Sequence, residues 1–268
     1  MINTTNIAST AKIHRYAEVH PDAIIGEGVV IGPFVTIDQD VIIGDGTKIE
    51  TNAVIYEGTR IGSNCRIFPG AVIGAVPQDL KFIGEHTITE IGNNTTIREY
   101  VTINRGTIAE GKTVIGSNCL LMAYVHVAHD CIVGDHVILV NNVNLAGEVR
   151  IEDWAILGGM TGVHQFCSIG KHAMVSGGSL VRKDIPPYIK AGREPVSYAG
   201  INSVGLRRRN FSRETIHEIQ DIYRFIYQKG VNTSDALAII EKEMTASMER
   251  DEILQFIRNS KRGIIPGI

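Results

Sequence analysis

The chain has 268 residues and a formal net charge of −3, so its overall charge gives no reason to expect binding to nucleic acid. Apolar residues make up 44% of the sequence, which permits a sizeable core, but aromatic residues make up only 6%, so aliphatic side chains must fill that core. No apolar run approaches the roughly 20 residues needed to cross a bilayer, and residues 1–12 are polar, unlike a signal peptide. We therefore expect a cytoplasmic protein with no transmembrane segment.

An aliphatic residue recurs at every sixth position through most of the chain. The series covers positions 13–73, 91–103 and 115–181, and each of its members is Ile, Val or Leu. The residue four positions later is Ala, Val, Thr, Cys or Ser throughout, except at Pro77 and Ile185, where runs end. A period this strict indicates a repeat architecture.

Each six-residue unit predicts one short strand and a turn, with the aliphatic residue pointing inward and the small residue where the wall bends. Three units make a triangular coil of 18 residues, and the coils stack through parallel strand pairing, so that each coil buries its neighbour. Side chains 18 positions apart should then lie in columns. The pattern is typical of the left-handed parallel β-helix with hexapeptide repeats. The handedness follows from that resemblance, because general topology rules favour right-handed crossovers.

The cysteines share one position in the repeat. Each occupies the small position of its unit, at Cys65, Cys119, Cys131 and Cys167. We therefore expect small core residues rather than metal ligands or disulfides.

Two segments, 75–90 and 108–113, interrupt the repeat, and Pro186-Pro187 ends it. Loops that leave a rigid scaffold often carry function, although a tolerated insertion has the same appearance. We predict a β-helical domain over 1–186 that contains both excursions. A connecting segment and a small α-helical domain should occupy 187–268.

Beyond Asn210 the apolar period changes from 6 to 3.6. Ser212 can cap a helix that Gly230 would end, and further helical patterns lie near 234–247 and 250–260. The predicted buried face of the first helix consists of Ile216, Ile219, Ile222, Tyr223 and Ile226.

The densest polar cluster of the repeat is the sequence HVAHD, with His126, His129 and Asp130. The 18-residue rule predicts the columns His129–Gly147–Gln165 and His126–Asn144–Gly162, with His164 beside Gln165. The cluster should therefore continue along one edge of the β-helix over three coils. A functional site is one interpretation, and surface decoration is the other.

Several segments together resemble a known family. They are HVAHDCIVGDHVILVNN, the LAG that follows it, GGMTGVHQFCSIG, QDLK in the first excursion, and the GL-RRR-NFSRE run before the first helix. The sequence is similar to the acyl-carrier-protein-dependent UDP-N-acetylglucosamine O-acyltransferases of lipid A biosynthesis, over the whole chain. The resemblance implies a homotrimer that transfers a 3-hydroxyacyl chain from acyl carrier protein to the 3-hydroxyl of UDP-N-acetylglucosamine, the first step of that pathway. It implies no cofactor and no metal.

The resemblance assigns His129 as the general base, Asp130 as the carboxylate that orients it, and the Gly147 amide as a donor to the oxyanion. The chemistry is consistent, because a sugar hydroxyl must lose its proton as it attacks a thioester, and a neutral imidazole accepts a proton near pH 7. A neighbouring carboxylate holds such a base in place. A residue without a Cβ lets its amide approach the reacting oxygen.

The resemblance also implies a set of positions for the sugar nucleotide. They are Asp79, Lys81, His126, His164, Gln165, Asn202, and Arg208 or Arg209. Paired guanidinium donors suit a pyrophosphate. The run 207–209, together with Arg193 and Lys171, can equally face an acidic acyl carrier protein or be a solvated charge run, and these alternatives remain open.

The resemblance places Gly177 in the acyl groove, where the missing side chain would admit a long acyl chain; an ordinary turn glycine is the alternative. Three positions depart from the family pattern. Glu148 and Asn104 stand where histidines are common, and Val204 stands where an acidic residue would contact the uracil.

Three other functions remain compatible with the sequence. A γ-class carbonic anhydrase would bind zinc through His126, His129 and His164 from two subunits. A β-helical scaffold would have no catalysis at all. A sibling acyltransferase would act on a different amino sugar.

Overall fold

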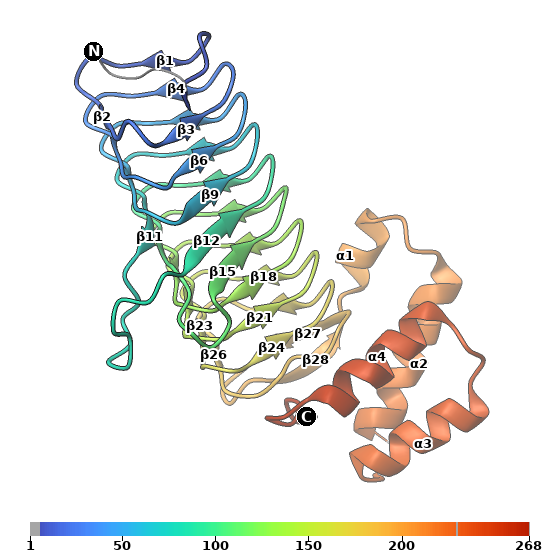
Figure 1. Ribbon diagram of the computed structural model, residues 1–268. Coiled ribbons are helices and arrows are strands. Elements are labelled where there is room, and N and C mark those ends of the chain that lie inside the picture. Colours follow the sequence, from blue (N-terminus) through green and yellow to red (C-terminus); the bar gives the residue numbers. More distant parts are fainter. Residues whose placement is uncertain (1–5, 229, 268) are drawn as a thin grey trace.

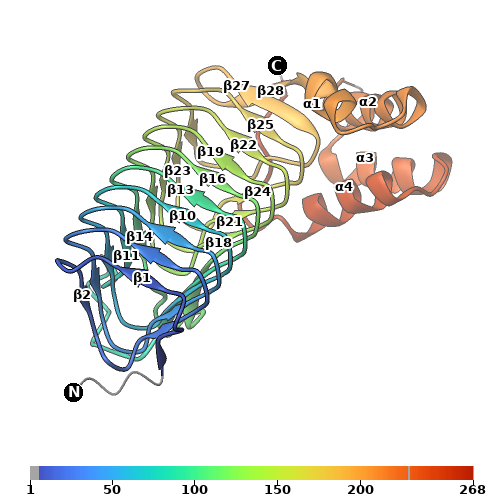
Figure 2. The ribbon, with the colours of Figure 1, turned by 90° about the horizontal axis from the view of Figure 1, so that it is seen from above.

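The computed structural model describes residues 6–228 and 230–267. It is a three-sided left-handed parallel β-helix followed by a helical domain (Figure 1), and the view from above shows the stacked coils obliquely (Figure 2). The first five residues of the predicted β-helical domain, and the last residue of the predicted helical domain, lie outside the described residues.

Three sheets form the walls, and each is named here after its first strand. The β1 sheet contains β1 (Lys12–Ile13), β4 (Val30–Ile31), β7 (Lys48–Ile49), β10 (Arg66–Ile67), β13 (Thr96–Ile97), β16 (Leu120–Leu121), β19 (Ile138–Leu139), β22 (Ile156–Leu157), β25 (Met174–Val175), β27 (Ile189–Gly192) and β28 (Ser197–Ile201). The β2 sheet contains β2 (Glu18–Val19), β5 (Thr36–Ile37), β8 (Val54–Ile55), β11 (Val72–Ala75), β14 (Thr102–Asn104), β17 (His126–Val127), β20 (Asn144–Leu145), β23 (Gly162–Val163) and β26 (Leu180–Val181). The β3 sheet contains β3 (Ile24–Ile25), β6 (Ile42–Ile43), β9 (Thr59–Ile61), β12 (Ile88–Ile91), β15 (Lys112–Ile115), β18 (Ile132–Val133), β21 (Arg150–Ile151) and β24 (Ser168–Ile169).

The predicted columns are confirmed by the strand register. His126 pairs with Asn144, and Asn144 pairs with Gly162, each in parallel. Inside the walls, aliphatic side chains of successive coils are buried against one another in one continuous core. This stacking makes each coil depend on its neighbours for burial.

The cysteines are buried core residues, as expected from their position in the repeat, and all of them are free. Burial raises the pKa of the Cys119 thiol to about 11 and that of the Cys131 thiol to about 12. Both thiols therefore stay protonated and act as small apolar side chains.

The long excursion leaves the wall between β11 and β12 and projects beside the lower coils (Figure 1). Two residues at the end of β14 hold its base. The side chain of Asn104 donates to Val76 O at 3.0 Å, and Arg105 lies over the ring of Phe82 while it pairs with Glu57 at 3.0 Å. Asn104, a departure from the family pattern, thus has a structural partner in the excursion.

The C-terminal part contains α1 (Ser203–Arg208), α2 (Arg213–Gln228), α3 (Thr233–Glu243) and α4 (Met248–Asn259). The Ser212 hydroxyl accepts a hydrogen bond from the Thr215 amide at 3.1 Å, and the predicted face of α2 is buried, so this helix is confirmed. The antiparallel β27–β28 hairpin and α1 were not predicted; they occupy the segment expected to be only a connection. No helix in the described ranges is long and apolar enough to cross a membrane.

A ladder of aromatic rings joins the helical domain to the edge between the β3 and β1 sheets. Trp154 stacks on His136 at 3.9 Å between ring centroids and on His172 at 6.1 Å, and His172 stacks on Tyr188 at 5.6 Å. Phe211, just before α2, packs edge-on against His172 at 5.1 Å. Contacts between aromatic rings thus connect the last coils of the β-helix to the helical domain.

The ladder predicts a specific pH dependence of stability. Burial, and secondarily the Arg209 guanidinium, lowers the pKa of His172 to about 4. An unfolded histidine titrates near about pH 6.5, so between these values the unfolded chain binds a proton that the folded chain does not. Stability therefore falls as the pH drops through this window, by about 3 kcal/mol at most.

The variant His172→Phe keeps an aromatic ring in the ladder but cannot titrate. When the free energy of unfolding is measured with denaturant, we expect it to fall less between about pH 7 and pH 4.5 in the variant than in the parent. Identical pH dependence in parent and variant would contradict the assignment.

Candidate active site

A cavity of about 550 Å³ opens along the edge where the β2 sheet turns into the β3 sheet. Strands β17, β20, β23 and β26 form its floor. The predicted site residues that line it are His126, His129, Gly147, His164 and Gln165. The 18-residue register thus brings together the polar cluster that the sequence indicated.

His129 and Asp130 form a hydrogen-bonded pair at this edge. The distance from His129 Nδ1 to Asp130 Oδ2 is 2.8 Å, and the side chain of His129 is 17% exposed while that of Asp130 is fully buried. Asp130 occupies the corner with φ of 60°, a left-handed conformation that Asp tolerates better than most residues. The imidazole is therefore held from behind and open to the cavity in front.

Two threonines on either side of the short excursion fix the position of Asp130. Thr107 donates its amide to Asp130 Oδ1 at 2.8 Å and its hydroxyl to Oδ2 at 2.6 Å. The Asp130 amide donates to Thr113 Oγ1 at 2.8 Å. Neither threonine was predicted from the sequence as a site residue. Their only signal was the place of Thr107 at the small position of its unit, directly before the excursion.

Gly147 lies directly against the His129 ring. A Cβ at this position would come within 2.7 Å of both Cε1 and Nε2 of His129. The amide of Gly147 has no hydrogen-bond acceptor among the described residues. The missing side chain of Gly147 therefore leaves room for the His129 ring, and the Gly147 amide remains available to donate a hydrogen bond.

His126 and His164 occupy the cavity floor in different ways. His126 Nδ1 lies 2.7 Å from the Thr102 hydroxyl, and burial lowers the pKa of His126, so this imidazole stays neutral around neutral pH. His164 Nδ1 lies 3.1 Å from Gln165 O.

The excursion contributes Gln78 to the cavity, a residue that the sequence analysis did not select. The predicted residues Asp79 and Lys81 follow it but do not line the cavity. They belong to one turn, in which the Lys81 amide donates to Asp79 Oδ1 at 3.0 Å. Leu80, between them, is fully exposed.

The other predicted nucleotide-binding residues lie elsewhere in the same chain. Asn202 is buried, caps α1 through Gly205, and donates to His172 O at 2.9 Å. Arg209 donates to Trp154 O at 3.0 Å, whereas Arg208 is exposed. Figure 1 shows α1 and the excursion on opposite sides of the β-helix. One chain does not bring these residues to His129.

Gly177 follows β25 on the way from the β1 sheet to the β2 sheet. A Cβ here would come within 3.0 Å of Gly159 O in the preceding coil, so the glycine has a packing reason of its own. Val204 is exposed in the first turn of α1, and Glu148 lies one coil beyond Asp130 at the same corner.

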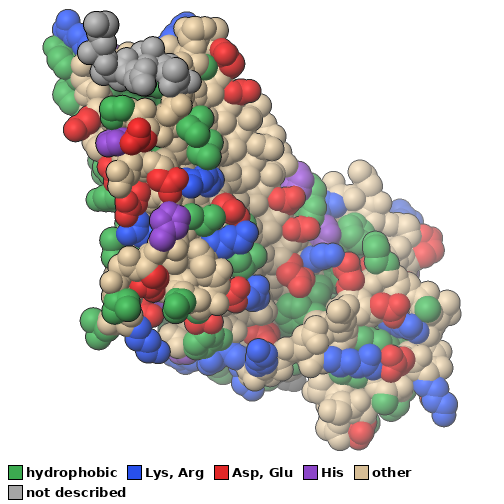
Figure 3. Space-filling view, in the orientation of Figure 1, with side chains coloured by type: hydrophobic (Ala, Val, Ile, Leu, Met, Phe, Trp, Pro, Cys, Tyr) green, Lys and Arg blue, Asp and Glu red, His purple; other side chains and the backbone are tan. Residues whose placement is uncertain are grey.

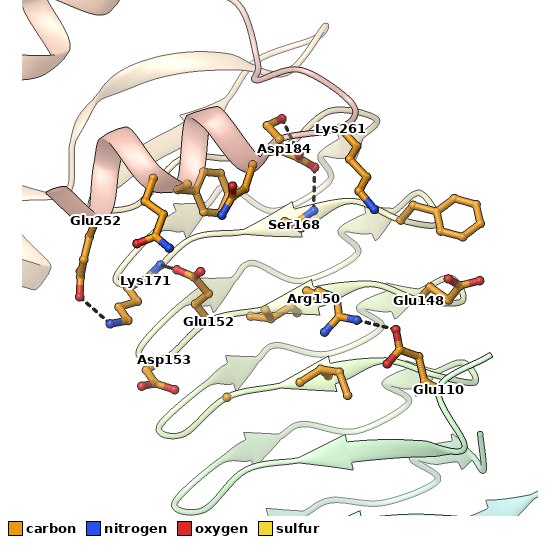
Figure 4. A pocket seen from close by; sticks show the side chains of 18 residues that line it. Glu110, Glu148, Arg150, Glu152, Asp153, Ser168, Lys171, Asp184, Glu252 and Lys261 are labelled. Atoms are coloured by element: carbon orange, nitrogen blue, oxygen red, sulfur yellow. Dashed lines mark hydrogen bonds and ion pairs between the residues drawn. The ribbon is translucent and has the colours of Figure 1, made fainter. Parts of the chain in front are cut away.

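A second groove, of about 770 Å³, runs between the β3 sheet and α4 (Figure 4). Its cations are mostly paired: Lys171 with Glu252 and Arg150 with Glu110, each at 2.6 Å. Lys171 is therefore already engaged within the chain.

Family models match most of the chain. Residues 184–265 match the model described as UDP N-acetylglucosamine O-acyltransferase, domain 2. Residues 112–147 match the bacterial transferase hexapeptide model, and residues 1–119 match the GMPPB C-terminal domain. The fold and these matches define a hexapeptide-repeat transferase.

Relatives narrow the family further. A protein of Thiobacillus denitrificans, named acyl-[acyl-carrier-protein]--UDP-N-acetylglucosamine O-acyltransferase, is 49% identical over 95% of this chain and 99% of its own length. A UDP-N-acetylglucosamine acyltransferase structure from Bacteroides fragilis is 55% identical, with a TM-score of 0.89 over 97% of this chain and 99% of that one. The corresponding structure from Campylobacter jejuni is 35% identical, with a TM-score of 0.91 over 96% of this chain and 100% of that one.

The chain belongs to the UDP-N-acetylglucosamine O-acyltransferase family. The resemblance found in the sequence is thereby confirmed, together with the left-handed β-helix and the class of enzyme. The carbonic anhydrase and scaffold hypotheses lose their support, because the relatives named above are O-acyltransferases.

The contact between Gly147 and His129 gives a sharp test of the site. We expect Gly147→Ala to displace the imidazole from Asp130 and to lower kcat by about 10²-fold or more, with little change in thermal stability. The matched control is Gly162→Ala on the same floor, where a Cβ would meet nothing closer than Leu180 Cδ2 at 3.5 Å. Equal activities of the two variants would show that the His129 position is not critical.

Proposed function

We propose that this protein transfers a 3-hydroxyacyl chain from acyl carrier protein to the 3-hydroxyl of UDP-N-acetylglucosamine, the first step of lipid A biosynthesis, in the cytoplasm. The observation that carries the proposal is the His129–Asp130 pair in an open cavity of a family member. The reaction needs a base and an oxyanion donor, and no cofactor beyond the carrier thioester.

The hydrogen bonds around Asp130 favour one tautomer of the His129 imidazole. Asp130 Oδ2 accepts from the Thr107 hydroxyl and lies 2.8 Å from His129 Nδ1. With the carboxylate as acceptor, the imidazole proton is on Nδ1 and the lone pair is on Nε2. The Cε1–Nε2 side of the ring faces the missing side chain of Gly147, where the reacting groups would meet.

In the proposed reaction His129 Nε2 takes the proton of the sugar 3-hydroxyl while that oxygen attacks the thioester carbonyl carbon. The Gly147 amide donates to the oxygen of the tetrahedral intermediate. The C–S bond then breaks, the ester forms, and the proton on His129 passes to the departing thiolate. Asp130 stabilises the imidazolium during this sequence without taking its proton.

Binding of the sugar nucleotide is proposed for the rest of the cavity. His126, His164 and Gln165 offer hydrogen-bonding groups on the floor, and Asp79 and Lys81 extend from the excursion beside Gln78. A neutral His126 can bond to a sugar hydroxyl without the cost of burying a charge.

We further propose a homotrimer with three equivalent sites, each between two subunits. Asn202, Arg208 and Arg209 lie across the β-helix from His129 in one chain, so a neighbouring subunit would have to supply them. Flat walls can meet around a threefold axis, and the cleft between two walls is a natural ligand site. Arg208, exposed and without an ion pair among the described residues, is the better placed guanidinium for a phosphate.

The function is tested by assaying the purified protein with acyl carrier protein thioesters and two acceptors, UDP-N-acetylglucosamine and its 3-amino analogue. We expect the hydroxyl acceptor to be used, and His129→Ala to lose about 10²–10⁴-fold in rate while it keeps the assembly intact. Preference for the amine would indicate the sibling acyltransferase, and an unchanged rate for the variant would contradict the base.

The shared site is tested by mixing two impaired variants, His129→Ala and Arg208→Ala. If each site takes His129 from one subunit and Arg208 from the next, random reassembly should restore both residues in about one quarter of the sites. Activity should therefore rise well above that of either variant alone. No gain after denaturation and joint refolding would place both residues in sites of a single chain.

Gly177 is proposed to leave the acyl groove open for a long chain, since each buried CH₂ contributes about 0.8 kcal/mol. Gly177→Ala would contact the backbone of Gly158 and Gly159, most closely Gly159 O, whereas Gly177→Met would also fill the groove. We expect competition between thioesters to shift toward shorter chains in the Met variant relative to the Ala variant. The same preference in both would leave Gly177 with a packing role alone.

A further inference from the structure

The columns of the catalytic edge end in two cations. One coil after His164 and Gln165, the register places Arg182 and Lys183, which directly follow β26. Arg182 lines the catalytic cavity, and both side chains are exposed. Positive charge thus borders the C-terminal mouth of the cavity.

The end of the chain adds two more cations to this place. The Ser260 hydroxyl donates to Asp184 Oδ2 at 2.6 Å, and the Asp184 amide donates to Gly263 O at 3.0 Å. These bonds fix Lys261 and Arg262 beside the same edge, where Arg262 Nε donates to Arg182 O at 3.3 Å. Here the basic rim denotes Arg182, Lys183, Lys261 and Arg262.

The cations of the basic rim are not held in ion pairs within the part of the chain that the structure describes. Among the described residues none of its members forms an ion pair. Figure 3 shows Lys and Arg side chains gathered at the lower end of the β-helix, between the excursion and the C-terminal helices. By contrast Lys171 is paired with Glu252, and Arg209 is bound to Trp154 O.

The groove on the other side of this edge is predominantly acidic, and of the basic rim only Lys261 also lines it. Figure 4 shows Glu148, Glu152 and Asp153 around it, while Lys171 and Arg150 are each tied to a carboxylate. An acidic partner would be repelled there and attracted to the basic rim. The edge that carries the site therefore lies between the basic rim and a predominantly acidic groove.

We propose that the basic rim is the docking surface for the acidic carrier protein that delivers the acyl thioester. This inference rests on the proposed function. Lys183 lies three coils from His129, and with about 4.8 Å between paired strands the separation is about 15 Å. An extended pantetheine arm spans that distance, so a carrier docked on the rim can place its thioester at His129.

The test uses the double variant Lys183→Glu/Lys261→Glu, because neither residue lines the cavity with His129. The matched control is Arg213→Glu/Lys242→Glu, which makes the same change of charge at exposed positions of α2 and α3. Each protein is assayed with one acyl chain on two donors, the carrier protein and free pantetheine, with thermal unfolding as a check of the fold.

We expect the rim variant to raise KM for the carrier thioester by about tenfold or more, with a weaker dependence on salt than the parent. Its KM for the pantetheine thioester and for the sugar nucleotide should change by less than about twofold, and the control should match the parent. Equal KM values for the carrier thioester in all three proteins would overturn the inference, as would a rise confined to the sugar nucleotide, which would make the rim a pyrophosphate site. If the parent transfers from neither donor, the proposed function itself is contradicted.

Discussion

The register with which each coil pairs to the next is the constraint on which the rest of this structure depends. Because a side chain meets its equivalent 18 positions later, one change of register would move a whole wall of aliphatic residues out of the core. The same register assembles the site, since it stacks Gly147 against His129 and places Gln165 and Lys183 further along one edge. Burial of the core and assembly of the proposed site therefore follow one geometric rule.

The two interruptions are where the repeat is broken, and each break contributes residues to the proposed active site. The short one lets Thr107 and Thr113 close around Asp130, which holds the His129 ring toward the cavity. The long one brings Gln78 over the cavity floor and is anchored at its base by Asn104 and Arg105. A fully buried carboxylate that accepts several hydrogen bonds cannot rotate, so the proposed base, His129, is held in position before substrate arrives.

The repeat made most of the fold predictable, because its period is local and strict. The columns, the buried cysteines and the face of α2 all followed from residue spacing, and so did the cluster around His129. The β27–β28 hairpin and α1 did not, since they follow no period and are held by contacts far away in sequence, such as Asn202 to His172. Thr107 was missed for a similar reason: at the small position of a unit, a threonine that packs and one that bonds to a carboxylate 23 residues away look alike.

The most direct test of this account is a structure of the protein with bound UDP-N-acetylglucosamine. The account predicts a trimer in which the sugar 3-hydroxyl lies within hydrogen-bond reach of His129 Nε2, about 2.6–3.2 Å, while the pyrophosphate meets Arg208 of a neighbouring subunit. A nucleotide sugar bound with its 3-hydroxyl away from His129, or held by residues of one chain alone, would contradict it.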